Sequence, residues 1–114
     1  GLAMIKVNWD VEELVALIDI YRKSVVSDKC IIEDELQALA ERLVKRADKL
    51  GIVHDEKFRN LNGMKMMFQN VVYVATDGKQ GLSAASARMQ KVYSLLRTNP
   101  DVFDMILEDF NHTF

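Results

Sequence analysis

Residues 58–70 place polar side chains among strongly apolar positions of an expected helix. They read FRNLNGMKMMFQN. Arginine, asparagine, lysine and glutamine carry the donors and acceptors that suit phosphate oxygens and base edges, so a helix presenting them could lie in a groove of duplex DNA. The candidate contacts in this segment are Arg59, Asn60, Asn62, Lys65 and Gln69.

A basic region leads into this segment. The 114-residue chain has a formal net charge of −2, yet residues 42–65 carry seven bases against three acids, whereas residues 1–41 carry four against nine. Lys45, Arg46 and Lys49 are therefore candidate phosphate contacts. Interaction with the helix dipole and with solvent is the alternative interpretation of these three residues. The nearly neutral total limits how much phosphate attraction the domain supplies alone.

The other reactive residues form no catalytic pattern. Neither His54 nor His112 belongs to an H-x-x-x-H or H-E-x-x-H arrangement, and Cys30 is the only cysteine, so neither a metal site nor a disulfide is expected. No G-x-x-x-x-G-K-[ST] or G-x-G-x-x-G motif for nucleotide binding occurs. We expect no enzymatic activity, no cofactor and no metal.

Helical periodicity predicts that one all-α domain, a compact bundle of about five helices, positions these residues. Asp10 with Glu13 three residues later predicts a capping box at the start of a helix over residues 11–23. An apolar stripe over residues 32–50, followed by Gly51, predicts a long second helix with a left-handed C-cap.

The third helix is the one expected to present the polar candidates. Asn62 is its predicted N-cap, which competes with a role for Asn62 in base contact, and the Asp-Gly pair at 77–78 is expected to end the helix. Ser83 is the predicted N-cap of a fourth helix, and Asn-Pro at 99–100 predicts the start of a fifth.

Several short motifs along the chain resemble a known family. Trp9, Glu12 and Glu13 give a W-x-x-E-E opening, residues 58–66 give FRN-x-NG-x-x-M, and Gly-Leu-Ser follows at 81–83. The pattern resembles an N-terminal helical domain of bacterial restriction and HNH-nuclease-type proteins, and it covers most of the chain. The resemblance implies a DNA-contacting domain that accompanies a nuclease or defence module.

The opening W-x-x-E-E-L also resembles the first helix of Myb-like domains, whose third helix reads the major groove. This resemblance implies a helix-turn-helix-like arrangement of the first three helices, with the third as the reading element. The chain departs from the Myb-like pattern, because its second helix is much longer and one Trp with several Phe replaces the regularly spaced tryptophans. The inference of DNA recognition from the Myb-like resemblance is therefore an analogy between folds.

Two function classes follow. The first is a DNA-binding, targeting module of a bacterial restriction or defence protein, with duplex DNA as partner and with a linked effector domain or a homodimer as further possibilities. The second is a protein-interaction or oligomerisation domain without nucleic-acid binding, which would use the acidic face of the first helix or an apolar patch from the fifth. The alternative to a DNA contact for Arg59 and Asn60 is that they hold the connector before the third helix by hydrogen bonds to backbone groups. Basic candidates on one face clear of acids would favour the first, and scattered bases the second.

The ends and the apolar runs of the chain bear on where the protein resides. No apolar run approaches the roughly 18 residues needed to cross a bilayer, and no signal peptide is recognisable, so a cytoplasmic protein is expected. Because no Met stands first, residues 1–3 are expected to be a tag remnant, with one domain over 4–114 excised from a longer protein.

Overall fold

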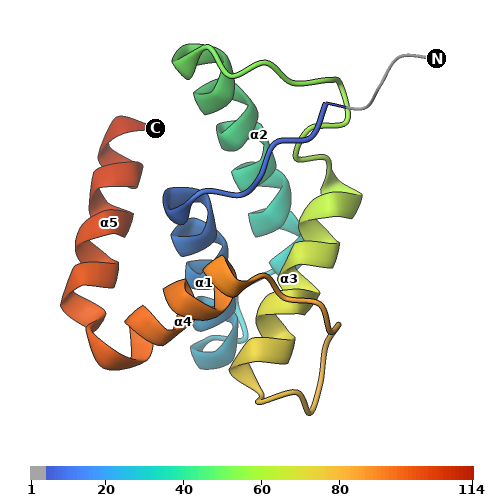
Figure 1. Ribbon diagram of the computed structural model, residues 1–114. Helices are drawn as coiled ribbons and strands as arrows, with labels where there is room; N and C mark the ends of the chain where they lie inside the picture. The colour runs from blue at the N-terminus through green and yellow to red at the C-terminus, as the bar shows by residue number, and fades with distance from the viewer. Residues whose placement is uncertain (1–4) are drawn as a thin grey trace.

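The computed structural model describes residues 5–114, which form five α-helices and no strand (Figure 1). The predicted all-α bundle of about five helices is confirmed. The predicted tag remnant at 1–3 lies outside the described residues. The helices are α1 (Val11–Val26), α2 (Ile32–Leu50), α3 (Leu61–Ala75), α4 (Ala87–Thr98) and α5 (Pro100–Thr113).

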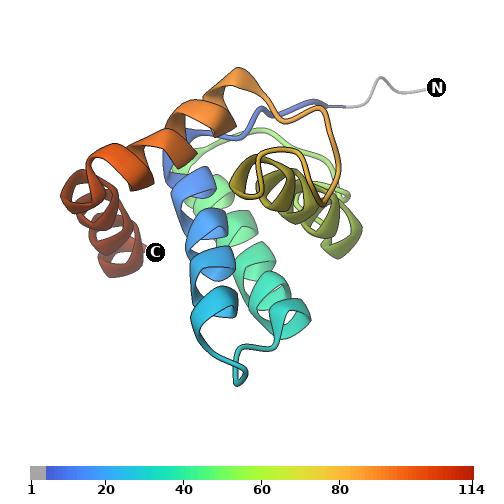
Figure 2. The same cartoon turned by 90° about the horizontal axis from the view of Figure 1, so that it is seen from below.

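Helix α1 is the centre of the bundle, since it packs against each of the other four helices (Figure 2). Leu14, Leu17 and Ile18 on this helix are completely buried. The first three helices also pack pairwise on one another, while α4 and α5 close the opposite side of α1. A strongly apolar α1 is therefore required, because solvent reaches few of its positions.

The predicted start of α1 is confirmed in atomic detail. The backbone N–H of Glu13 donates to Asp10 Oδ1 at 2.9 Å, and the backbone N–H of Asp10 donates to Glu13 Oε1 at 3.1 Å. The helix runs to Val26 rather than to Lys23, since Ser24 to Val26 contain no helix-breaking residue. Gly51 has a φ of 72° and is the left-handed C-cap of α2, as predicted.

The predicted caps of α3 and α4 are each displaced along the chain. Asn60, not Asn62, caps α3, and its side chain accepts from Gly63 N at 2.8 Å. Arg59 has a φ of 50°, and this turn leaves Asn60 as the last extended residue before the helix. Ser86, not Ser83, caps α4, because Ala84 has a φ of 79° and no helix can pass through it.

The loop between α3 and α4 lies tightly against α3. The backbone N–H of Leu82 donates to the Gln69 carbonyl at 3.0 Å, and Asn70 Nδ2 donates to the carbonyls of Leu82 and Ser83. At Gly81 an added Cβ would lie 2.4 Å from the carbonyl oxygen of Gln69. Only glycine fits here, because φ is 84° and backbone atoms fill the space.

Gly81→Ala is expected to destabilise the fold well beyond the cost of a left-handed backbone alone. The matched control is Gly51→Ala, where φ is 72° but nothing lies within 4 Å of the added Cβ. We expect the control to lose about 1 kcal/mol and Gly81→Ala at least twice as much. Urea unfolding followed by helical circular dichroism measures both, and equal losses would contradict the close approach.

Candidate functional site

The side chain of Arg59 forms a buried ion pair with Glu13. Arg59 Nε donates to Glu13 Oε2 at 2.7 Å and Arg59 Nη2 donates to Glu13 Oε1 at 3.0 Å. The two side chains are 7% and 3% exposed. Glu13 is at the same time part of the capping box of α1. The pair therefore fixes the connector before α3 to the start of the central helix.

Arg59 also joins the segment before α1 to the same cluster. Its Nη1 and Nη2 donate to the carbonyls of Val7 and Asn8, each at 3.2 Å. Its guanidinium lies between the rings of Trp9, at 4.5 Å, and Phe58, at 4.3 Å. Arg59 faces the protein interior, as the alternative interpretation of this residue held, and a DNA contact would require this cluster to break.

Two more of the predicted contacts make contacts within the chain, Arg46 with a buried side chain and Asn60 with an exposed one. Arg46 is 8% exposed, its Nη1 lies 2.8 Å from Asp10 Oδ2 and its Nη2 lies 3.6 Å from Glu12 Oε2. Asn60 caps α3. Arg46 fills a position on the buried side of α2, where the acids at the start of α1 compensate its charge.

The other five predicted contacts are exposed, but they are not alike. Lys65 Nζ lies 2.7 Å from Glu33 Oε1, and this hydrogen bond with the ammonium group lowers the pKa of Glu33. Lys49 lies over the ring of Phe114, at 5.7 Å. Across residues 5–114, the side chains of Lys45, Asn62 and Gln69 form no hydrogen bond or ion pair.

The basic candidates do not share one face clear of acids. Glu41 and Glu56 line the same shallow depression as Lys45, and Glu33 neutralises Lys65. Arg46 and Arg59 are compensated by acids of α1 and its cap. We call the buried Arg59–Glu13 pair the clamp. The predicted contacts thus include residues held by acids within the protein, Arg59 of the clamp among them, and exposed residues that are scattered over the surface.

The structure reveals a feature that the sequence motifs did not indicate, which we call the N-terminal groove. It has a volume of about 770 Å³ and lies between residues 5–9, the connector at 55–60 and α3. Ile5 is 43% exposed and Met66 is 60% exposed. The apolar side chains along it are those of Ile5, Val7, Trp9, Phe58, Met66 and Met67, and the polar and charged ones include Lys6, Asp55, Lys57 and Asn70.

Sequence reasoning missed this groove because one wall is an irregular segment. Residues 5–9 have no helical or strand periodicity to mark them as part of a surface. Met66 lies between Met64, which is completely buried, and Met67, which packs against the core. A usable signal was the apolar Met66-Met67 pair, since consecutive positions of a helix point about 100° apart and a helix with one buried stripe leaves one of the two outside it.

His54 contacts the connector before α3 and the last turn of α2. The imidazole stacks on Phe58 with a centroid distance of 4.6 Å. Its Nδ1 lies 2.9 Å from the carbonyl oxygen of Asp55, and its Nε2 lies 2.7 Å from Asp48 Oδ1. Both partners are acceptors, so the doubly protonated ring satisfies both, and the pKa of His54 is raised, first by the Asp55 carbonyl and then by Asp48.

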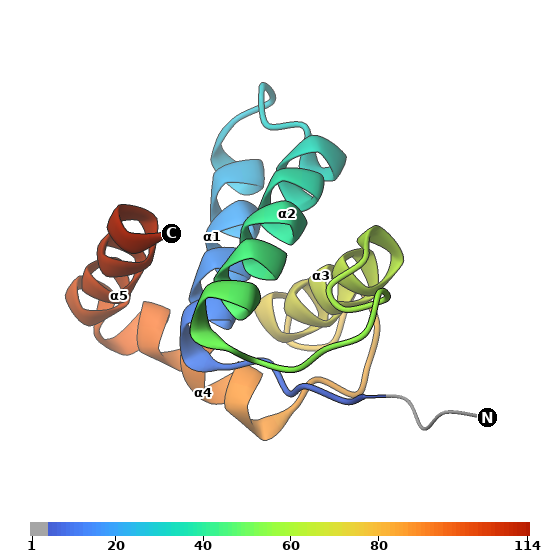
Figure 3. The same ribbon diagram turned by 90° about the horizontal axis from the view of Figure 1, so that it is seen from above.

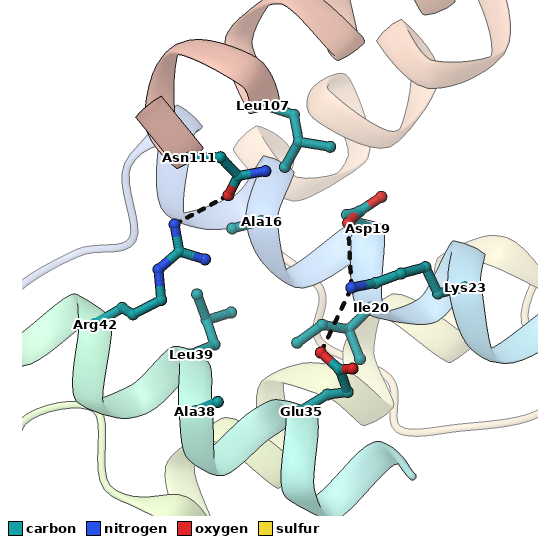
Figure 4. Close-up of a pocket in the computed structure, with 10 residues that line it drawn as sticks. All are labelled: Ala16, Asp19, Ile20, Lys23, Glu35, Ala38, Leu39, Arg42, Leu107 and Asn111. Atoms are coloured by element: carbon teal, nitrogen blue, oxygen red, sulfur yellow. Dashed lines mark hydrogen bonds and ion pairs between the residues drawn. The ribbon is translucent and has the colours of Figure 1, made fainter. Parts of the chain in front are cut away.

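A second, smaller pocket lies between α1, α2 and α5 and has a volume of about 170 Å³ (Figure 4). Lys23 Nζ lies 3.7 Å from Asp19 and 3.4 Å from Glu35, and Arg42 Nη2 donates to Asn111 Oδ1 at 2.9 Å. Burial lowers the pKa of Arg42. Because its polar groups mostly satisfy one another, this pocket is the weaker candidate for a binding site.

Other site types are not found in residues 5–114. No group of three or more His, Cys, Asp or Glu residues is arranged to hold a metal ion there. Within the same range, no helix is both long and apolar enough to span a bilayer. No protein-family model, characterised protein or solved structure matches the chain. The groove and its clamp are therefore the basis for assigning a function.

Arg59→Ala is expected to cost about 3–5 kcal/mol of folding free energy, because it leaves the Glu13 carboxylate buried without its partner. The matched control is Lys65→Ala, which removes an exposed lysine from an exposed carboxylate and should change stability little. Urea unfolding of the two variants measures the difference. If both variants were as stable as the parent chain, Arg59 would not be the clamp described above.

His54 should make stability depend on pH. Because the folded-state pKa is raised, the stabilisation is complete below the ordinary pKa of 6.5 and is lost as the pH rises through the folded-state value. We expect the urea midpoint of the parent chain to fall as the pH rises above 6.5, and the midpoint of His54→Gln to change less. His112→Gln is the control, and its urea midpoint should fall with rising pH as that of the parent chain does. If His54→Gln had the same pH profile as the parent chain, His54 would not be the cause of the pH dependence.

Proposed function

We propose that this domain is a protein-interaction module whose contact surface is the N-terminal groove. The observation that carries the proposal is the exposure of apolar side chains around a concave surface. Contiguous exposed apolar surface in a soluble protein marks sites of association, and the groove volume falls in the range of binding sites. Met66 and Met67 add unbranched side chains that adapt to different partner shapes.

The walls of the groove are held in place before any partner arrives. Trp9 and Phe58 are stacked on Arg59, which is itself held by Glu13. A preformed surface loses less conformational entropy on binding than a flexible one. Lys6 and Lys57 lie on the groove and are exposed. These features favour a partner segment with apolar anchors beside acidic residues.

The second candidate function is binding of duplex DNA by a targeting module of a restriction or defence protein. It is supported by the motif resemblance and by the exposure of Lys45, Asn62 and Gln69 without side-chain partners among residues 5–114. It is weakened by the internal use of Arg46 and Arg59 and by the acids near Lys45. Its contact set is accordingly narrower than the sequence implied.

One comparison separates the two functions. A random-peptide library displayed on phage is selected on the parent domain, and the enriched peptides are remeasured on Met66→Glu and on Met105→Glu. Met105 is a matched control, since it is an exposed methionine on α5, outside the groove. We expect peptides with apolar anchors and acidic neighbours, binding lost in Met66→Glu and kept in Met105→Glu.

The same proteins are titrated with duplex DNA at low and at physiological salt. Salt-dependent DNA binding that is weakened by Lys45→Ala, together with no peptide enrichment, would overturn the interaction proposal and favour the second function. Peptides that bind Met66→Glu as well as the parent would also overturn it, because the contact surface would then lie elsewhere.

A further inference from the structure

A second exposed apolar surface lies at the turn between α1 and α2. We call it the hairpin tip and define it as residues 25–32. Val26 is 80% exposed and Ile31 is 60% exposed, and Val25 and Ile32 are exposed beside them. Four branched apolar side chains at one turn are unusual for a surface that contacts only water, since turns are normally polar. The tip therefore requires an explanation of its own.

The charge around the hairpin tip is negative. Residues 28–35 contain Asp28, Glu33, Asp34 and Glu35 against the single base Lys29. Glu33 is paired with Lys65, and Glu35 lies 3.4 Å from Lys23. The side chains of Asp28 and Asp34 form no ion pair within the described part of the chain. The tip thus combines apolar anchors with uncompensated carboxylates.

The N-terminal groove has the opposite character. Lys6 and Lys57 line it and form no ion pair within residues 5–114, and Arg88 lines the adjacent depression with Lys6. Asp55 is the acid along the groove, and its Oδ1 accepts from the backbone N–H of Lys57. The charge of Arg59 is already offset by Glu13. An apolar segment with acidic neighbours therefore complements the groove.

The tip and the groove lie at different ends of the molecule. In Figure 3 the α1–α2 turn is at the top, whereas the segment before α1 and the connector before α3 run along the lower side. One molecule cannot bring its own tip into its own groove without unfolding. Any contact between them must join two copies.

We propose that the N-terminal groove of one copy binds the hairpin tip of a second copy of this chain. The proposal rests on the proposed interaction function and names its partner. Contacts between two tips would oppose carboxylates, and contacts between two grooves would oppose lysines, so the pairing of unlike surfaces is favoured electrostatically. Such a head-to-tail contact forms a ring when the rotation between copies closes, and an open chain when it does not.

Sedimentation velocity of the parent chain tests the association. We expect the average mass to rise as the concentration increases from low micromolar to about 1 mM, and to rise less at high salt, because the rim charges are exposed. Val26→Glu and Met66→Glu should each remain monomeric over the same range. The matched controls Val53→Glu and Met105→Glu change exposed apolar residues outside both surfaces and should associate like the parent.

Mixing the two monomeric variants tests whether the groove of one copy contacts the tip of the other. Val26→Glu keeps an intact groove and Met66→Glu keeps an intact tip, so an equimolar mixture has one productive contact and should form dimers and nothing larger. A mixture that stays monomeric would overturn the proposal, as would a parent chain that is monomeric at every concentration. Association that survives Val26→Glu would also overturn it.

The failure of this inference differs from the failure of the proposed function. A monomeric parent chain that still selects peptides through Met66 keeps the groove as an interaction site and removes the second copy as its partner. If the parent chain neither selects peptides nor associates, both the interaction function of the groove and the second copy as its partner are excluded. Circular dichroism of Val26→Glu and Met66→Glu confirms that each is folded, since both positions are exposed.

Discussion

The buried Glu13–Arg59 pair is the interaction on which the functional surface depends. Glu13 belongs to the N-terminal cap of the central helix, and Arg59 belongs to the connector before α3. Burying a carboxylate and a guanidinium is costly unless each satisfies the other with good geometry, and here two short hydrogen bonds do so. The chain around the start of α1 and the connector before α3, which are distant in sequence, are thereby held at one point.

This clamp explains why the motif residues gather without forming a polar reading surface. Trp9 and Glu13 of the W-x-x-E-E motif and Phe58 of the FRN motif each contact the side chain of Arg59. Asn60 of the second motif caps α3. The motifs therefore describe how the groove wall is built. What the groove binds is decided by the exposed residues beside the clamp, Ile5 and Met66 among them.

The fold was largely predictable because its signals are local. The capping box at Asp10, the C-cap at Gly51 and proline at the first position of α5 depend on neighbours within a few residues, and each is where the sequence predicted it. The caps of α3 and α4 were misplaced since positive φ values at Arg59 and Ala84 decide them. Those backbone angles are set by tertiary contacts of the two connectors.

By itself the sequence determined the helical class, the five elements and the set of polar residues available for binding. The tertiary structure alone decided which of those residues face solvent. Arg59 and Arg46 have the composition of phosphate contacts, but acids more than 30 positions away compensate them inside the protein. A sequence shows a charge and not its partner, because a long-range ion pair has no fixed spacing along the chain.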